Sequence, residues 1–564
     1  MRWVKMEINH LRYEAVAEYS SVFGHPLDDS SLIDKLSHIS CQKILAILSR
    51  FSCLHIAVCN GDAAAMKLND YLRFIHSRHI NDLGGNKYIY NQFRFIMCSQ
   101  SIFVLDKWAI KYCPVSTNAE PITQKDVCLI MDLLLVVNDK LPKSEVEGNE
   151  TEYLYLMLYH NTHKAIKNEI ARSYYVFSKL AYEDNETSSW LKQYEEKCGF
   201  SLEQRLAVLT NSLAHMLPRY TLPDFFIGVY TTVNGFNAQG LSPVYDKVME
   251  TVRADRKTIR SGLRRDLEQV WDFEPFYRYP FIKIKDEQIA FSVDSILYQL
   301  WEGLYWNVRY TLQRDDGVEF MTDFGKPFEH YIQEISRESA NRSGKIVRYQ
   351  NEFLYRYEGN QKASTDCYLR VNDVLVAVEA KAKSPHSDTI SGVAHEAIET
   401  EVNELMVAPI EQAAKRLKEI TSEKAEITDG EKQFFEGIER TIILSVSMEK
   451  VQPVGKLLYE FDERVKETIS GTNVVAYHNV SIQDYEVICG LIEDYPEEVS
   501  AILLRWFEDQ RKDSRSVVVL SNFLHTFNKK YRCSEYVSLL FDQAFEEIIK
   551  RTFEKPTTLD TLQQ

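Results

Sequence analysis

Two acidic side chains and a lysine stand on two neighbouring apolar segments in the second half of the chain. Asp366 opens the first segment, and Glu379 and Lys381 end the second, which begins at Val374. The short polar stretch 371–373 between the segments predicts a β-hairpin. Glu379 and Lys381 are two residues apart on a strand, so their side chains point to the same face. A charged side chain at a core position of an apolar strand is energetically unfavourable unless an ion pair or a bound ligand compensates its charge.

A divalent cation would account for this pattern. Asp366 and Glu379 supply the hard oxygen ligands that such an ion prefers, and Lys381 beside it would orient water or stabilise a phosphate. These residues predict a divalent-metal site with a lysine placed to act on water or on a phosphate. A surface hairpin whose Glu and Lys form an exposed pair of little energetic value is the alternative interpretation.

The arrangement resembles the PD-(D/E)XK nuclease superfamily, whose restriction-endonuclease-like core runs helix, three strands, helix, strand. Segments of the expected character follow in this order along the chain. They are a helix opened by 325–332, a strand over 346–357, the hairpin, a helix over about 410–420 and a buried strand over 440–448. The resemblance therefore implies an αβββαβ nuclease-like core and a Mg²⁺ or Mn²⁺ cofactor.

The resemblance also implies further site residues. Glu329 in the opening helix matches the acidic residue that many members add to the metal site, and the carbonyl of Ala380 is the usual additional ligand. Gln412 is similar to the glutamine that members carry on the helix behind the site. Lys383, one pleat beyond Lys381, is either a second phosphate contact or a solvated lysine at the strand end.

The net charge of −16 implies that any contact with nucleic acid is local. Positions 253, 257, 260 and 264 follow helical spacing and predict a basic stripe, with a solvated helix face as the alternative. The stripe belongs to a basic patch made of Arg253, Arg256, Lys257, Arg260, Arg264 and Arg265. A second basic set lies within the nuclease-like core and includes Arg348 and Arg356. Its members are Arg342, Lys345, Arg348, Arg356, Lys362 and Arg370.

The length of 564 residues predicts several domains in an α+β or α/β arrangement. We expect a mainly helical N-terminal region that divides near 145–150, a connecting hairpin and aromatic helix, the nuclease-like domain and a mainly helical C-terminal region. The expected bounds are 1–275, 276–319, 320–450 and 451–564. The aromatic residues of the connecting helix, over 293–310, form either core or a surface that stacks bases.

The remaining composition favours a cytoplasmic protein. The ten cysteines are scattered and form no CxxC pair, which indicates reduced thiols. No signal peptide or membrane-spanning run is evident, so we expect no membrane association.

The resulting prediction is a metal-dependent nuclease, with DNA favoured as substrate and a role in antiviral defence or DNA repair implied by the resemblance. Protein partners or a homo-oligomer would form through the helical regions. The alternatives are an inactive nuclease-fold scaffold and an RNA-directed nuclease.

Overall fold

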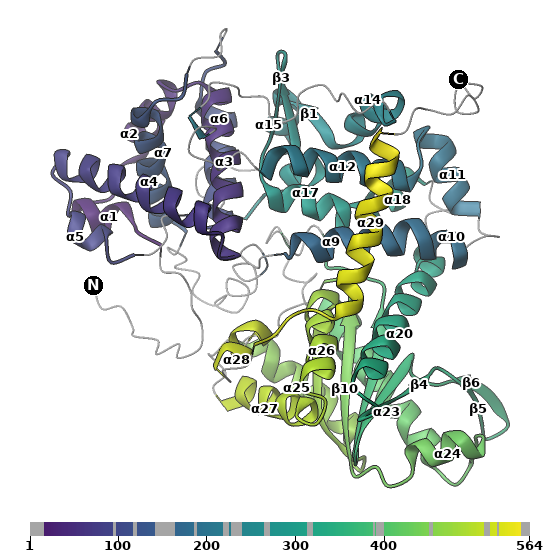
Figure 1. The fold of residues 1–564 in the computed structure, drawn as a ribbon. Coiled ribbons are helices and arrows are strands. Elements are labelled where there is room, and N and C mark those ends of the chain that lie inside the picture. The colour runs from purple at the N-terminus through teal and green to yellow at the C-terminus, as the bar shows by residue number, and fades with distance from the viewer. Residues whose placement is uncertain are drawn as a thin grey trace.

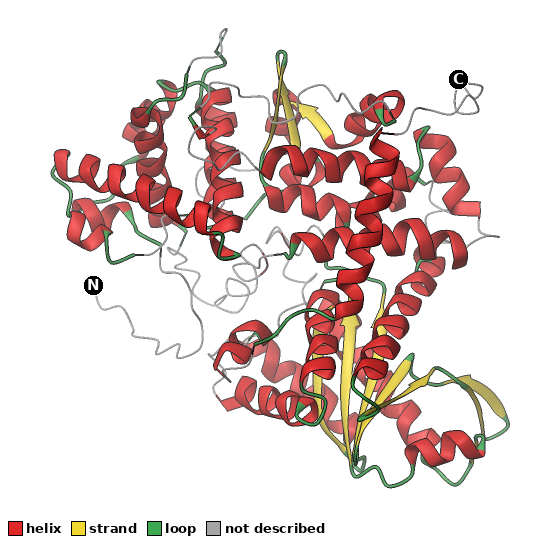
Figure 2. Cartoon of the chain, in the orientation of Figure 1, coloured by secondary structure: helices red, strands yellow, loops and turns green. Residues whose placement is uncertain are grey.

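The protein is mostly helical and has a mixed β-sheet among its helices, which places it in the α+β class (Figures 1 and 2). It is seen here in a computed structural model. The structure describes residues 16–93, 97–116, 121–141, 159, 164–184, 189–217, 225–226, 240–263, 271–312, 320–386, 390, 400–449, 455–512, 519–526 and 530–553.

The first helices form a cluster around α3 (Cys41–Cys59) (Figure 1). Among the described residues, α3 is the one helix with the length and apolar composition of a membrane span, and nearly all of it is buried inside this cluster. The other helices are α1 (Tyr19–Phe23), α2 (Asp29–Ser37), α4 (Ala63–Asp82), α5 (Lys87–Tyr90), α6 (Ser99–Tyr112) and α7 (Gln124–Lys140).

A hairpin and two short helices close the same apolar core. The hairpin, β2 (Phe281–Ile284) and β3 (Glu287–Ala290), forms at the predicted place, and β1 (Arg253–Asp255) pairs with β2 in parallel. The helices are α15 (Arg256–Gly262) and α16 (Glu274–Arg278).

A second group of helices shares one apolar core with the large sheet. The last helix, α29 (Glu535–Phe553), starts near the sheet and runs back across this group, where it packs on α9 (Ile166–Tyr174) (Figure 1). The predicted domain bounds remain predictions, but the apolar core is continuous across position 320. The remaining members are π-helix η1 (Tyr175–Leu180), α10 (Ala181–Asp184), α11 (Ser189–Cys198), α12 (Leu202–Met216), α14 (Ser242–Val252), α17 (Val293–Leu300) and α18 (Glu302–Thr311).

The expected single helix over 293–310 is wrong, because α17 and α18 are separated at Trp301. The Trp301 indole is buried and its Nε1 donates to the carbonyl of Met448 at 3.3 Å. Tyr305 is also buried, so these aromatic residues form core, as the first of the two interpretations held.

The large sheet has the strand order β11-β10-β8-β7-β4. Strands β4, β7 and β8 are antiparallel, whereas β8, β10 and β11 are parallel. Antiparallel β7 and β8 are joined by the two-residue turn Asn372-Asp373, in which Asn372 adopts a positive φ of 56°. The strands are β4 (Val347–Asn351), β7 (Cys367–Val371), β8 (Val374–Lys381), β10 (Arg440–Ser447) and β11 (Val474–Ser481).

Alternating side chains of the strands serve two apolar cores. On β8, Val376 and Val378 belong to the core that contains α20 (Gly325–Arg342) and α26 (Ile482–Asp494). Leu375 and Ala377 belong to the core under α23 (Ala408–Ile420) and α25 (Gly455–Ile469). Continuing this alternation puts Glu379 on the α23 face.

The expected first strand over 346–357 is wrong, because β4 ends at Asn351 and the chain starts a separate strand, β5 (Leu354–Tyr357). The backbone N–H and carbonyl of Phe353 form hydrogen bonds with Ser364. These bonds direct β5 away from the large sheet and into a small sheet of order β6-β5-β9. That sheet also contains β6 (Asn360–Ala363) and β9 (Ala425–Glu426).

The remaining elements flank β10 in the chain. Strand β11 and helix α26 follow it, and the Ser481 side chain caps the N-terminus of α26. The other elements are π-helix η3 (Val402–Val407), α24 (Asp429–Phe435), α27 (Val499–Lys512) and α28 (Leu520–Thr526).

Candidate active site

A row of polar residues crosses the α23 face of the sheet. Cys367 pairs with Asn351 on one side and with Val378 on the other. One register position further, Asp366 stands between Glu352 and Glu379, and the Glu352 amide donates to the Asp366 carbonyl at 3.1 Å. Because β10 is in register with β8 and β11, the row continues through Ser445 and Asn479. The sheet therefore places three acids next to one another although they are far apart in sequence.

The two predicted acids of the hairpin are both buried, Asp366 to 7% exposure and Glu379 to 1%. Asp366 Oδ2 accepts the backbone N–H of Ala380 at 2.6 Å, which fixes its carboxyl against β8. Burial raises the pKa of Asp366 well above its usual range, and the nearby carboxylates of Glu379 and Glu329 raise it further. Both causes, burial first, disfavour a negative charge on Asp366.

Lys381 is held between the strand and helix α23. Its Nζ lies 3.1 Å from Glu379 Oε1 and donates to Gln412 Oε1 at 3.2 Å. The structure thus brings together the predicted lysine, its neighbouring acid and the predicted helix glutamine. Gln412 acts as the acceptor that directs the ammonium group toward the sheet end.

Arg416 is a member of this group that the predicted site residues did not include. Its Nη1 donates to both carboxylate oxygens of Glu379, at 2.9 Å and 3.1 Å. The available signal was its spacing of four residues from Gln412, which puts both side chains on one face of α23.

Glu329 and Glu352 complete the acidic surroundings. Burial, together with the charge of Glu352, raises the pKa of Glu329 to about 7. Burial raises the pKa of Glu352 as well, whereas Arg416 lowers it. Sequence reasoning missed Glu352, because its position depends on where β4 ends and on the register of β4 against β7.

The other predicted contacts in the core lie away from this group. Lys383 follows the end of β8 and forms an ion pair with Glu404 of η3. Arg348 is opposite Arg370, and its guanidinium stacks 5.2 Å from the centre of the Phe434 ring. Arg348 is four residues from Glu352, which is about 13 Å along the strand.

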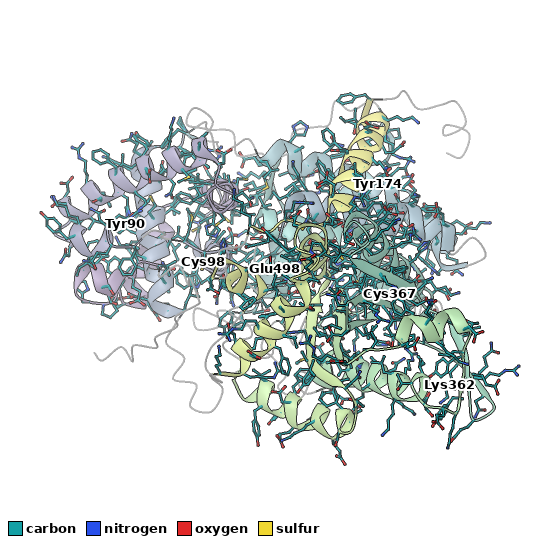
Figure 3. All side chains as sticks on the ribbon, turned by 60° about the horizontal axis from the view of Figure 1, so that its bottom comes forward. Tyr90, Cys98, Tyr174, Lys362, Cys367 and Glu498 are labelled. Atoms are coloured by element: carbon teal, nitrogen blue, oxygen red, sulfur yellow. The ribbon has the colours of Figure 1, made fainter. Side chains whose placement is uncertain are left out.

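The outer basic residues belong to the small sheet. Arg356 lies on β5, exposed and opposite Glu426. Lys362 lies on β6, away from the N-terminal helices (Figure 3), and its Nζ is 2.7 Å from Glu419 Oε1. Neither is placed with the acids of the sheet end.

The predicted helical stripe between Arg253 and Arg265 is wrong, because Arg253 lies on β1 and α15 covers only Arg256–Gly262. Arg256 donates to the carbonyls of Ile110 and Cys113 and so ties α15 to the end of α6. Arg260 is exposed on α15, and residues 264–270 lie outside the described residues.

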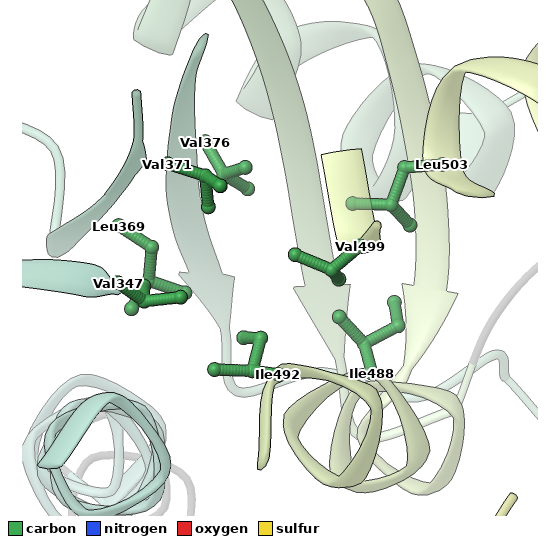
Figure 4. A pocket seen from close by; sticks show the side chains of 8 residues that line it. All are labelled: Val347, Leu369, Val371, Val376, Ile488, Ile492, Val499 and Leu503. Carbon is green, nitrogen blue, oxygen red and sulfur yellow. The ribbon is translucent and has the colours of Figure 1, made fainter. Parts of the chain in front are cut away.

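An apolar cavity lies on the opposite face of the sheet, between the strands and helices α26 and α27 (Figure 4). Only aliphatic side chains line it, so it offers no group for chemistry. They are Val347, Leu369, Val371, Val376, Ile488, Ile492, Val499 and Leu503.

The donor set suits a hard divalent cation, although its present geometry is not that of a formed metal site. Asp366, Glu379 and Glu329 offer carboxylate oxygens. The pKa values of Asp366 and Glu329 are raised, and a bound cation would lower them by stabilising the ionised carboxylates. Within the described ranges, no three His, Cys, Asp or Glu side chains converge closely enough to hold a metal ion. Arg416 and Lys381 engage the Glu379 carboxylate instead.

Comparison of the chain with protein-family models, with curated proteins and with solved structures finds no match.

Proposed function

We propose that this protein is a metal-dependent nuclease that hydrolyses phosphodiester bonds, with DNA as the favoured substrate. The observation that carries the proposal is the meeting of Asp366, Glu379 and Lys381 at one end of the sheet, with Gln412 bonded to the lysine. The order α20, β4, β7, β8, α23, β10 supports a core of the restriction-endonuclease type. A role in antiviral defence or DNA repair would follow from the same resemblance.

Asp366, Glu379 and Glu329 would hold a Mg²⁺ or Mn²⁺ ion, together with the carbonyl of Ala380. Such an ion, when bound, supplies charge stabilisation for the phosphate and lowers the pKa of water. The Ala380 amide keeps the Asp366 carboxyl turned toward β8. Lys381 Nζ would hold the attacking water or neutralise the scissile phosphate, and Gln412 limits its movement.

The test is cleavage of linear, circular and single-stranded DNA, and of RNA, by the full chain in Mg²⁺, Mn²⁺ or EDTA. We expect metal-dependent cutting that Glu379→Ala and Lys381→Ala each abolish, while Glu423→Ala, at an exposed position after α23, cuts as the wild type does. Preference for RNA would redirect the proposal to an RNA-directed nuclease. Wild-type protein that cuts nothing under any of these conditions would instead favour the nonhydrolytic scaffold.

A further inference from the structure

Arg416 engages the most deeply buried acid of the site in a fork-like contact. Its Nη1 spans the two oxygens of Glu379 at 2.9 Å and 3.1 Å, and the Glu379 side chain is 2% exposed. Arg416 itself is 21% exposed, so its guanidinium reaches inward from the protein surface. A buried carboxylate needs such a partner, because an unpaired buried charge is strongly unfavourable.

The same guanidinium stands among the other acids of the sheet end. Its positive charge lowers the pKa of Glu352 and offsets part of the upward shift at Glu329. Glu379 lies beside Asp366 in the register of the sheet. Arg416 therefore holds a central position in the negative field, where a cation of the proposed site would also be most favourable.

We infer that Arg416 is an internal counter-cation, which occupies Glu379 in the metal-free protein and must leave it when a divalent ion binds. The inference rests on the proposed function and adds a regulatory step to the same site. A metal ion needs the Glu379 oxygen lone pairs that Arg416 now engages, so the two cations compete for one carboxylate. Once released, the guanidinium remains tethered to α23 beside the site and is suited to bind a phosphate through two parallel hydrogen bonds.

The inference predicts opposite effects of one substitution on metal binding and on cleavage. Arg416→Met removes the competitor, so the full chain should bind Mn²⁺ more tightly in calorimetric titration, by about tenfold if the competition is worth about 1.4 kcal/mol. Its DNA cleavage should nevertheless be slower than wild type at saturating Mn²⁺. Lys418→Met removes one exposed positive charge from the same helix and should leave both quantities unchanged.

A purely structural role for Arg416 would give a different result. If it only held Glu379 in place, Arg416→Met would bind Mn²⁺ no more tightly than wild type, and that outcome overturns the inference. Arg416→Lys keeps the charge but not the two-oxygen contact, and it should give an intermediate Mn²⁺ affinity. If Arg416→Met does not fold, the Mn²⁺ titration of Arg416→Lys decides the question. A Mn²⁺ affinity of Arg416→Lys equal to that of wild type would then overturn the inference.

Thermal unfolding provides a readout that does not depend on cleavage. In EDTA, Arg416→Met should unfold at a lower temperature than wild type because Glu379 keeps only Lys381 as a charged partner. Saturating Mn²⁺ should raise its unfolding temperature more than it raises that of wild type. Wild-type protein that binds no Mn²⁺ would reject the proposed function itself, whereas wild-type binding with no gain in the Arg416 variants would reject only this inference.

Discussion

Asp366 lies directly opposite Glu379 on the neighbouring strand, one register position beyond the Cys367–Val378 pair. Both carboxyls are buried, and the charge of Glu379 contributes to the raised pKa of Asp366. The folded protein therefore holds two acids close together at a cost that a bound cation would offset.

Asp366→Asn should separate chemistry from stability. The amide oxygen of the new side chain can still accept the Ala380 N–H, but it is a weaker metal ligand and carries no charge. We expect cleavage to fall by at least about 100-fold, the scale on which loss of one electrostatic group slows an enzyme. The unfolding temperature in EDTA should stay equal or rise, because the substitution removes a repulsive buried acid. A large drop in that temperature would show that Asp366 serves the fold rather than the site.

Gln412→Leu tests the positioning of Lys381. Because Gln412 Oε1 accepts from Lys381 Nζ at 3.2 Å, its loss should let the ammonium group move. Cleavage at saturating metal should slow by about 10- to 100-fold, as for other residues that orient a catalytic group. Mn²⁺ affinity measured by calorimetry should remain near wild type, and Lys418→Met serves again as the control. A matching loss of metal affinity would instead make Gln412 part of the binding site.

The pH dependence of stability should report on Glu329. Burial and the charge of Glu352 raise the pKa of Glu329 from 4.5 to about 7, so the folded protein holds this proton more tightly than the unfolded chain. Its stabilising contribution is then fully present below pH 4.5 and is lost as the pH rises toward about 7. Glu329→Gln should flatten this decline in unfolding temperature, measured in EDTA between pH 4 and 8.

Metal binding should follow the opposite trend with pH. Protons and a divalent ion compete for the same carboxyl, so Mn²⁺ affinity should increase as the pH rises through about 7. The steepness of that increase should be smaller in Glu329→Gln. An unchanged profile in this variant would remove Glu329 from the ligand set.

The buried ion pair between Arg172 of α9 and Glu486 of α26 should stabilise the packing of the helical region against the sheet. Arg172 Nη1 lies 2.6 Å from Glu486 Oε1, which also accepts from the Tyr331 hydroxyl at 2.8 Å. Arg172 also pairs with the buried Glu169, so Arg172→Met leaves two buried carboxyls without their cation and should lower the free energy of unfolding by about 3–5 kcal/mol. We expect the double variant Arg172→Met/Glu486→Gln to lose less than the sum of the single losses in denaturant titrations. Additive losses would show that the two side chains act independently.

This pair also bears on the site, because Tyr331 and Glu329 lie on the same helix, α20. Residues of α9, α20 and α26 meet around Glu486, so the helical region contacts the element that carries one of the proposed ligands. In Arg172→Met, a change in Mn²⁺ affinity without any substitution at the site would demonstrate this connection.

Local patterns in the sequence were sufficient for the central hairpin and its neighbours. Alternation of apolar residues, the polar turn at Asn372-Asp373 and the helical spacing of about 410–420 are short-range signals, and β7, β8 and α23 form where they indicate. The same-face relation of Glu379 and Lys381 follows from the two-residue period of a strand and needs no tertiary information.

Other features depended on partners that are distant in sequence. The break between β4 and β5 follows from the Phe353–Ser364 contact, and the break at Trp301 coincides with burial of its indole against the segment after β10. Neither partner is near enough in sequence to leave a local signal. Tertiary contacts therefore overrode the continuous strand and helix that propensity favoured.

The sequence by itself determined which residues could do chemistry, through their side-chain types. It also determined on which face of their strand or helix they lie, because the backbone periods of 2 and 3.6 residues govern side-chain direction. Only the tertiary structure decided which of these residues meet. The register of five strands placed Glu352 beside Asp366, and the packing of α23 on β8 brought Arg416 to Glu379. Strand register and helix packing depend on burying the entire apolar faces of strands and helices that are distant in sequence, so neither can be inferred from any single segment of the chain.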